Sequence, residues 1–192
     1  MEAQTKFFTL EDTLAELQSS NPTFEEVCTQ LFKFTYEDFD RLFIISGKEI
    51  PNETFLRLPI LEGKYVATLK IWGIDYATAI HDHKNYDGHI KVLKGTLTEL
   101  SYRENENFVE LNSVREGGEN AIFDEEESGI HSMVNNWDDI SVSLHIYRTY
   151  QRNLEGIRVF DTAKRRLAYL SNKANSCSWQ LSKDSYQRII KI

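Results

Sequence analysis

The chain has 192 residues, of which 41% are hydrophobic, and its 22 basic and 30 acidic side chains give a net charge of −8. This length and composition suit one globular domain, and an acidic chain without a clustered basic stretch excludes a nucleic-acid partner. No run of about 18 apolar residues occurs and residues 1–10 carry no leader-like apolar core, so we expect a protein that neither spans a membrane nor is exported.

Residues 1–50 are predicted to be helical. Thr9 and Asp12 form a candidate N-terminal cap, and the leucines that follow them repeat at helical spacing. Thr23 and Glu26 form a second capping box, followed by an apolar stripe. The sequence therefore predicts short amphipathic helices in this part of the chain.

From about residue 55 onward, short β-branched and aromatic runs alternate with turn residues. The candidate strands are 65–72, 78–83, 89–93, 96–102, 108–111, 121–123, 131–135 and 141–147. Residues 158–161 and 167–170 are predicted to add a hairpin. Strands this closely spaced favour an antiparallel sandwich or barrel over a parallel sheet.

We therefore expect one domain over residues 1–192 with three parts. These are a helical part over 1–50, a β-barrel over 55–161, and a C-terminal hairpin or extension over 162–192. The two cysteines, Cys28 and Cys177, lie far apart and form no paired spacing. Neither a disulfide framework nor a thiolate zinc site is indicated, and a reducing cytoplasm is the expected location.

The histidines are the most informative residues for function. All 5 fall in the segment from His81 to His145. Side chains alternate between the two faces of a strand, so His81 and His83 point to one face while Asp82 points away. His131 follows a turn-forming stretch. Three imidazoles in this setting indicate a mononuclear metal site; the alternative is three core or surface histidines without a metal.

Two segments of the chain resemble the motifs of a known superfamily. Residues 73–95 resemble the first motif of the cupins, double-stranded β-barrels that hold a metal, and residues 129–135 resemble the second. Most metal-binding cupins place a glutamate where this chain has Gly88, so the resemblance implies a site without its carboxylate ligand. A cupin with three histidines and no glutamate is similar to the thiol dioxygenases, specifically the cysteine dioxygenase type I family. The similarity covers residues 55–161.

This resemblance implies a fold, a metal and a reaction. The fold is mainly β, a cupin-type double-stranded β-barrel, or jelly roll, with N-terminal helices. His81, His83 and His131 would hold Fe(II), and three neutral imidazoles leave a doubly positive site that favours an anionic thiolate. L-Cysteine would bind through sulfur and amine, and both atoms of O2 would go to sulfur, giving cysteine sulfinate. The partners are thus a small thiol and O2, and no oligomeric state is indicated.

Further site residues follow from the same resemblance. Arg57 matches the arginine that clamps the substrate carboxylate, a task that suits its planar fork; the alternative is an exposed strand-end cation. Ser143, His145 and Tyr147 alternate and so share one face of a strand. In the family this row leads to a tyrosine hydroxyl beside the substrate, which makes Tyr147 the candidate for orienting substrate and moving protons. The alternative is a hydrogen-bonded core network.

Several features limit or broaden these expectations. Gly88 stands where some family members have a cysteine, so no thioether to Tyr147 can form. His89 is expected to be structural, and the acidic run 124–127 to form solvated loops. Three alternative functions stay open. They are a dioxygenase of 3-mercaptopropionate or another small thiol, a zinc, manganese or nickel cupin acting as isomerase or hydrolase, and a catalytically silent ligand-binding cupin.

Overall fold

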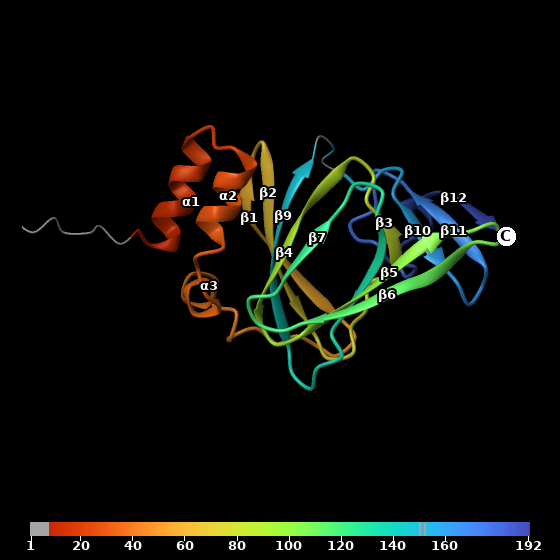
Figure 1. Ribbon diagram of the computed structural model, residues 1–192, viewed down its shortest axis with the longest axis horizontal. Coiled ribbons are helices and arrows are strands. Elements are labelled where there is room, and N and C mark those ends of the chain that lie inside the picture. Colours follow the sequence, from red (N-terminus) through yellow and green to blue (C-terminus); the bar gives the residue numbers. More distant parts are fainter. Residues whose placement is uncertain (1–7, 150, 152) are drawn as a thin grey trace, which may run out of the picture.

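The computed structural model describes residues 8–149, 151 and 153–192. In this part of the chain, three N-terminal α-helices precede two antiparallel sheets that face each other (Figure 1). The predicted cupin-type β-barrel with N-terminal helices is thereby confirmed. None of the described helices has the length and apolar character that a membrane crossing requires.

The helices begin where the sequence predicts caps. Their bounds are α1 Leu10–Ser19, α2 Phe24–Leu31 and α3 Tyr36–Phe43. Both predicted capping boxes are confirmed, because the Thr9 and Thr23 hydroxyls each accept from a backbone N–H three residues later. A third helix, α3, follows Thr35, whose backbone N–H donates to Asp38 at 3.0 Å.

The two sheets differ in size. The five-stranded sheet has the order β1-β2-β9-β4-β7, with bounds β1 Phe55–Glu62, β2 Tyr65–Trp72, β9 Ser141–Thr149, β4 Tyr86–Lys94 and β7 Ile122–Glu125. The seven-stranded sheet has the order β12-β11-β10-β3-β8-β5-β6. Its bounds are β12 Tyr186–Lys191, β11 Arg166–Leu170, β10 Arg158–Asp161, β3 Ile80–Asp82, β8 Ile130–Val134, β5 Leu97–Glu104 and β6 Val109–Gly117. A 3₁₀ turn, η1 Lys183–Ser185, precedes β12.

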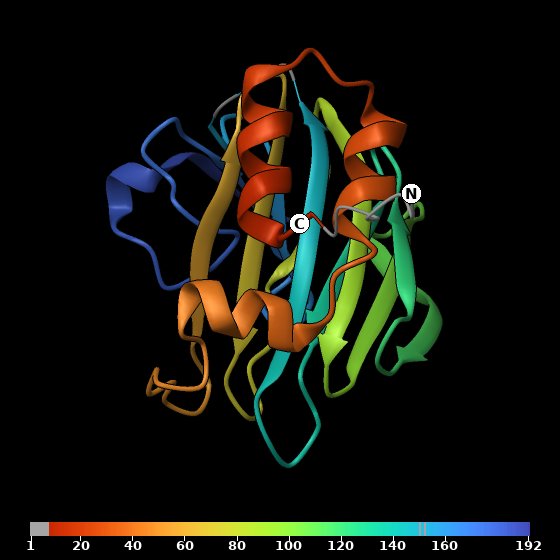
Figure 2. The ribbon, with the colours of Figure 1, turned by 90° about the vertical axis from the view of Figure 1, so that its left-hand side faces the viewer.

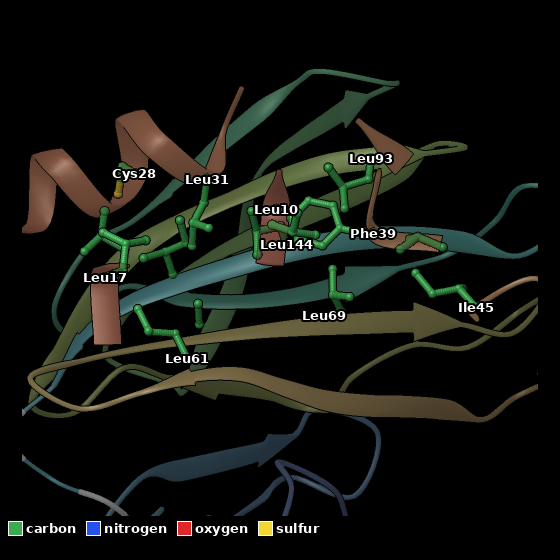
Figure 3. Close-up of a cluster of buried hydrophobic side chains, with 14 of the residues drawn as sticks. Leu10, Leu17, Cys28, Leu31, Phe39, Ile45, Leu61, Leu69, Leu93 and Leu144 are labelled. Atoms are coloured by element: carbon green, nitrogen blue, oxygen red, sulfur yellow. The ribbon is translucent and has the colours of Figure 1, made fainter. Parts of the chain in front are cut away.

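The helices cover the outer face of the five-stranded sheet, as Figure 2 shows. Leu69 of β2 and Leu144 of β9 point into this layer and pack with Leu10, Leu31 and Phe39 from the helices (Figure 3). Strand alternation then turns every second residue of β2 and β9 toward the barrel interior. The helical layer thus buries one face of the sheet and leaves the other face for the site.

The predicted strands agree with the structure at 65–72 and 158–161, and two strands were missed. Strand β1 contains Pro59, and its register with β2 shifts between Pro59 and Leu61, so it lacks clean alternation. Strand β12 is almost entirely exposed, so its sequence lacks the apolar alternation that predicts a half-buried strand. It pairs with β11 and extends the predicted C-terminal hairpin.

Candidate metal centre

The three predicted histidines come together inside the barrel. Strands β3 and β8 pair in the register that sets His81 opposite His131. His83 follows β3 directly. Its backbone N–H donates to the Gly129 carbonyl at 3.2 Å, which holds it beside the turn that precedes β8. One ring nitrogen of each histidine lies within 4.8 Å of the others, and all three residues are buried.

The outer nitrogens of these rings face hydrogen-bond acceptors. The Nδ1 atom of His81 lies 2.8 Å from the Ala79 carbonyl, and that of His131 lies 2.9 Å from a Glu99 carboxylate oxygen. The Nδ1 atom of His83 lies 3.3 Å from the carbonyl of Glu126. Since these oxygens only accept, each neutral ring carries its proton on Nδ1, which leaves the Nε2 lone pair free. Metal-bound histidines are oriented in this way.

The inner nitrogens are set for a cation. His83 Nε2 lies 3.0 Å from His131 Nε2, and neither can donate when the protons sit on Nδ1. The contact therefore brings together two lone pairs, which repel each other unless a positive ion lies between them and is coordinated by both. Burial, and then the neighbouring histidines, hold the pKa of His81 well below its usual value. Burial also lowers the pKa of His83, to about 4, so both rings stay uncharged near neutral pH.

Asp82 points away from the cluster, as strand alternation requires. It accepts hydrogen bonds from the Arg158 backbone N–H at 2.7 Å and from the Arg158 guanidinium at 2.6 Å. Arg158 also pairs with Glu104 at 2.8 Å. Arg158 thus pairs with two carboxylates behind β3, and its bonds to Asp82 hold the segment that carries His81 and His83.

A hydrogen-bonded row runs along β9 beside the cluster. Trp72 Nε1 donates to Ser143 Oγ at 2.8 Å, and Ser143 Oγ lies 2.8 Å from His145 Nε2. An indole N–H only donates, so Ser143 accepts from Trp72, which leaves the Ser143 hydroxyl proton available to His145 Nε2. His145 Nδ1 then carries the ring proton and donates to the Tyr147 hydroxyl at 2.7 Å. The phenolic proton of Tyr147 is thereby directed into the barrel.

Burial sets the charge states in this row. It holds the pKa of His145 well below the usual value, and nearby Lys70 adds to that effect. Burial also raises the pKa of Tyr147 well above 10, and the Glu125 carboxylate raises it further. Tyr147 is therefore a neutral donor over the physiological range.

A cavity of about 770 Å³ opens beside the cluster. His81 and Tyr147 reach it from the metal side, and Phe55 and Arg57 line it from β1. Lys70 also lines the cavity, and it lies opposite Arg57 in the β1–β2 register. Burial lowers the pKa of Lys70 while Glu125 opposes that effect. The sequence analysis did not predict Lys70 as a cavity residue. Because it alternates with Trp72 in the predicted strand 65–72, the two side chains could have been expected on the same face.

The acidic run corrects the sequence-based interpretation. Residues 124–127 were expected to form solvated loops, and three of them are exposed, Asp124, Glu126 and Glu127. Glu125 differs, because β7 extends to it and turns its side chain inward, where only 2% is exposed. Glu125 Oε1 lies 3.4 Å from His131 Nε2, and Oε2 lies 3.8 Å from His83 Nε2. Burial acts to raise the pKa of Glu125, but His83, His131 and Lys70 all act to lower it, and the net shift is downward. A buried carboxylate thus faces the histidine cluster.

The segment after β11 also reaches the cavity, which the sequence did not indicate. Asn172, Asn175 and Cys177 line it, and the Cys177 carbonyl accepts from the Ala79 N–H at 3.3 Å. Burial raises the pKa of the Cys177 thiol to about 12, so this sulfur stays protonated. A neutral thiol is a weak competitor for a metal ion.

His89 lies on the outer face of the sheet, outside the cluster. Its Nδ1 contacts Asp124 at 2.7 Å, and its ring packs near Phe24 and Phe32 of the helical layer. The expected structural position of His89 agrees with these contacts.

Comparison with known proteins gives one family match. The family model described as cysteine dioxygenase type I matches residues 39–163, a span that includes β3 and β8. Among solved structures, the chain is similar to TT1209 from Thermus thermophilus, at 14% identity over 60% of this chain and 98% of that chain, with a TM-score of 0.46. It is also similar to the cupin domain of Cnp3 from Schizosaccharomyces pombe, at 8% identity over 55% and 71%, with a TM-score of 0.44. A third similar structure is KdgF from Halomonas sp., at 14% identity over 57% of this chain and 94% of that chain, with a TM-score of 0.45.

Proposed function

Because the chain belongs to the cysteine dioxygenase type I family, we propose that it is an Fe(II)-dependent thiol dioxygenase that converts L-cysteine to cysteine sulfinate. Family membership supports a non-haem iron enzyme of this class. The observation that carries the proposal is the convergence of three neutral Nε2 lone pairs, two of them 3.0 Å apart. Neutral nitrogen donors suit divalent iron and leave its charge for an anionic thiolate.

In this proposal His81, His83 and His131 hold the iron through Nε2. The bound ion would supply the positions where thiolate and dioxygen meet and the electrons that activate dioxygen. The protein orients these ligands through the Nδ1 contacts behind each ring, since outer partners of this kind fix ring position and basicity. This proposal gives the redox chemistry to the metal and the alignment of its ligands to the barrel.

Tyr147 has the second role. At the end of the row from Trp72 through Ser143, His145 donates to the Tyr147 oxygen, which leaves the phenolic proton to donate inward. We assign Tyr147 to substrate orientation and to proton donation at the substrate's polar atoms, with Ser143 and His145 as positioning residues. A neutral phenol suits this task because it donates without adding charge.

Arg57 and Lys70 provide positive charge on the β1–β2 wall of the cavity. Their cross-strand pairing places two cations along one wall, and neither forms an ion pair with another described residue. A substrate carboxylate would satisfy both. The second cation also favours an acidic thiol without an ammonium group, so dioxygenation of 3-mercaptopropionate or another small acidic thiol is the second candidate function.

Oxygen uptake and sulfinate formation test the proposal. Iron-loaded protein is compared on L-cysteine, 3-mercaptopropionate and cysteamine, which lacks the carboxylate. We expect turnover with L-cysteine, its loss in H83A, and its retention in H89A, a matched histidine outside the cluster. Sulfinate formed from 3-mercaptopropionate alone would reject the cysteine assignment, and no uptake with any thiol would favour a silent binding cupin.

Metal analysis separates the remaining class. Protein purified without added metal is expected to hold iron, whereas zinc, manganese or nickel together with no thiol oxidation would favour an isomerase or hydrolase. The two cysteines are both unpaired, which supports a reducing, cytoplasmic setting for this activity.

A further inference from the structure

We propose that Glu125 is a fourth protein ligand of the metal ion, delivered from β7 in place of the carboxylate that most metal-binding cupins carry at the position of Gly88. This inference rests on the metal-binding role proposed for the three histidines. It changes the expected ligand set from three nitrogens to three nitrogens and one carboxylate oxygen.

The sheet register explains how the carboxylate arrives. Gly88 of β4 lies between Tyr147 of β9 and Glu125 of β7 in one cross-strand row. A Cβ at Gly88 would lie 2.1 Å from the Ile146 carbonyl oxygen and 2.7 Å from the Tyr147 ring, so no side chain fits there. The bare backbone at Gly88 lets Glu125 and Tyr147 approach each other across β4, where the Glu125 carboxylate raises the pKa of Tyr147.

The distances suit coordination. Two ligand atoms at right angles around an ion with bonds of about 2.1 Å lie roughly 3.0 Å apart. His83 Nε2 and His131 Nε2 lie at that separation, 3.0 Å. Glu125 Oε1 lies 3.4 Å from His131 Nε2 and Oε2 lies 3.8 Å from His83 Nε2, so each oxygen is within 1 Å of that separation from one of the two nitrogens.

One oxygen of the buried carboxylate also lacks a hydrogen-bond partner among the described residues. The Glu125 side chain is 2% exposed, and the oxygen without a partner is Oε2. The polar neighbours of the carboxylate include His131 Nε2 at 3.4 Å and His83 Nε2 at 3.8 Å, and Lys70 contributes the nearby positive charge. Buried carboxylates are ordinarily paired or bound to metals, and the unpartnered oxygen points toward the metal ligands.

The added ligand bears on substrate binding. Six-coordinate iron with four protein ligands keeps two open positions, enough for one sulfur and one oxygen molecule. The thiol would then bind through sulfur alone, and its carboxylate would extend toward Arg57 and Lys70. The negative ligand also reduces the net charge that three histidines alone would leave on the centre.

Cobalt binding tests this inference without turnover. Full-length wild type, Glu125→Gln and the matched control Glu127→Gln, whose residue is exposed, are titrated with Co(II), and affinity and visible absorption are measured. We expect E125Q to bind Co(II) at least about tenfold more weakly and with a changed spectrum, since ligand-sphere losses of this kind cost 10–100-fold. Unchanged affinity and spectrum in E125Q would overturn the inference, as would a defect confined to cysteine binding.

A crystal structure of Co(II)-loaded wild type provides a second measurement that needs no folded variant. A Glu125 oxygen bonded to the ion supports the inference, and a carboxylate turned away from the ion contradicts it. The outcome is separable from the proposed activity, because cobalt binding that depends on Glu125 stands even if the iron form oxidises no thiol. Conversely, thiol oxidation with a three-histidine site keeps the activity and removes the fourth ligand.

Discussion

Replacing Ser143 by alanine should destabilise the protein and disturb the direction of the hydrogen-bonded row. The Ser143 hydroxyl is the partner of both Trp72 Nε1 and His145 Nε2, each at 2.8 Å, and all three residues are 0% exposed. The variant orphans a buried donor and a buried acceptor. Each orphaned group costs about 1–3 kcal/mol, so the free energy of unfolding should fall by roughly 2–6 kcal/mol.

The same substitution should also allow the ring proton of His145 to move from Nδ1 to Nε2. Without the Ser143 proton, Nε2 of His145 can carry the ring proton, and Nδ1 then accepts from Tyr147 instead of donating to it. Chemical denaturation measures the stability, and ¹⁵N NMR of labelled histidine reports which ring nitrogen of His145 is protonated. The matched control is Ser113→Ala, at an exposed position of β6, which should change stability by less than about 0.5 kcal/mol. An S143A variant as stable as S113A, with the protonation of His145 unchanged, would refute the reasoning.

Three further predictions concern charge, backbone space and pH. Lys70→Met should raise the KM for 3-mercaptopropionate about tenfold, which corresponds to roughly 1.4 kcal/mol for one charged contact. The KM for cysteamine, which has no carboxylate, should not change, and equal effects on both thiols would contradict the carboxylate assignment. Gly88→Ala should lose at least about 2 kcal/mol of stability in chemical denaturation, because its Cβ would lie 2.1 Å from a backbone oxygen, whereas Gly118→Ala, with 3.9 Å of clearance, should be tolerated. Metal-free protein should lose thermal stability as pH falls below about 6.5, since unfolded histidines bind protons that buried His83 and His145, with lowered pKa values, do not. That stability is present above about pH 6.5, and a melting temperature that stays constant down to about pH 5 would argue against it.

Local periodicity was sufficient to predict much of the arrangement. The alternation of His81 and His83 and the row of Ser143, His145 and Tyr147 depend only on strand geometry, which the sequence patterning indicates. The pairing of His81 with His131 could not be read in this way, because register between β3 and β8 is a long-range property. The family resemblance supplied that link.

The unpredicted residues have physical reasons. Glu125 sits in a run of acids that looks solvated, and the extension of β7 turns it inward, opposite Gly88, which has no side chain. Cys177 reaches the cavity from an irregular segment with no periodicity to extrapolate. Lys70 was visible in principle, since it alternates with Trp72, but a lysine inside a barrel becomes plausible only once a carboxylate faces it.

Isotope labelling of the product tests the central claim most directly. Iron-loaded protein is supplied with L-cysteine under ¹⁸O2 in ordinary water, and the sulfinate is analysed by mass spectrometry. Dioxygenation at a metal centre formed by His81, His83 and His131 predicts that both product oxygens carry the label in every early turnover. Sulfinate carrying solvent oxygen, or labelled product formed equally well by the H81A variant, would contradict the account.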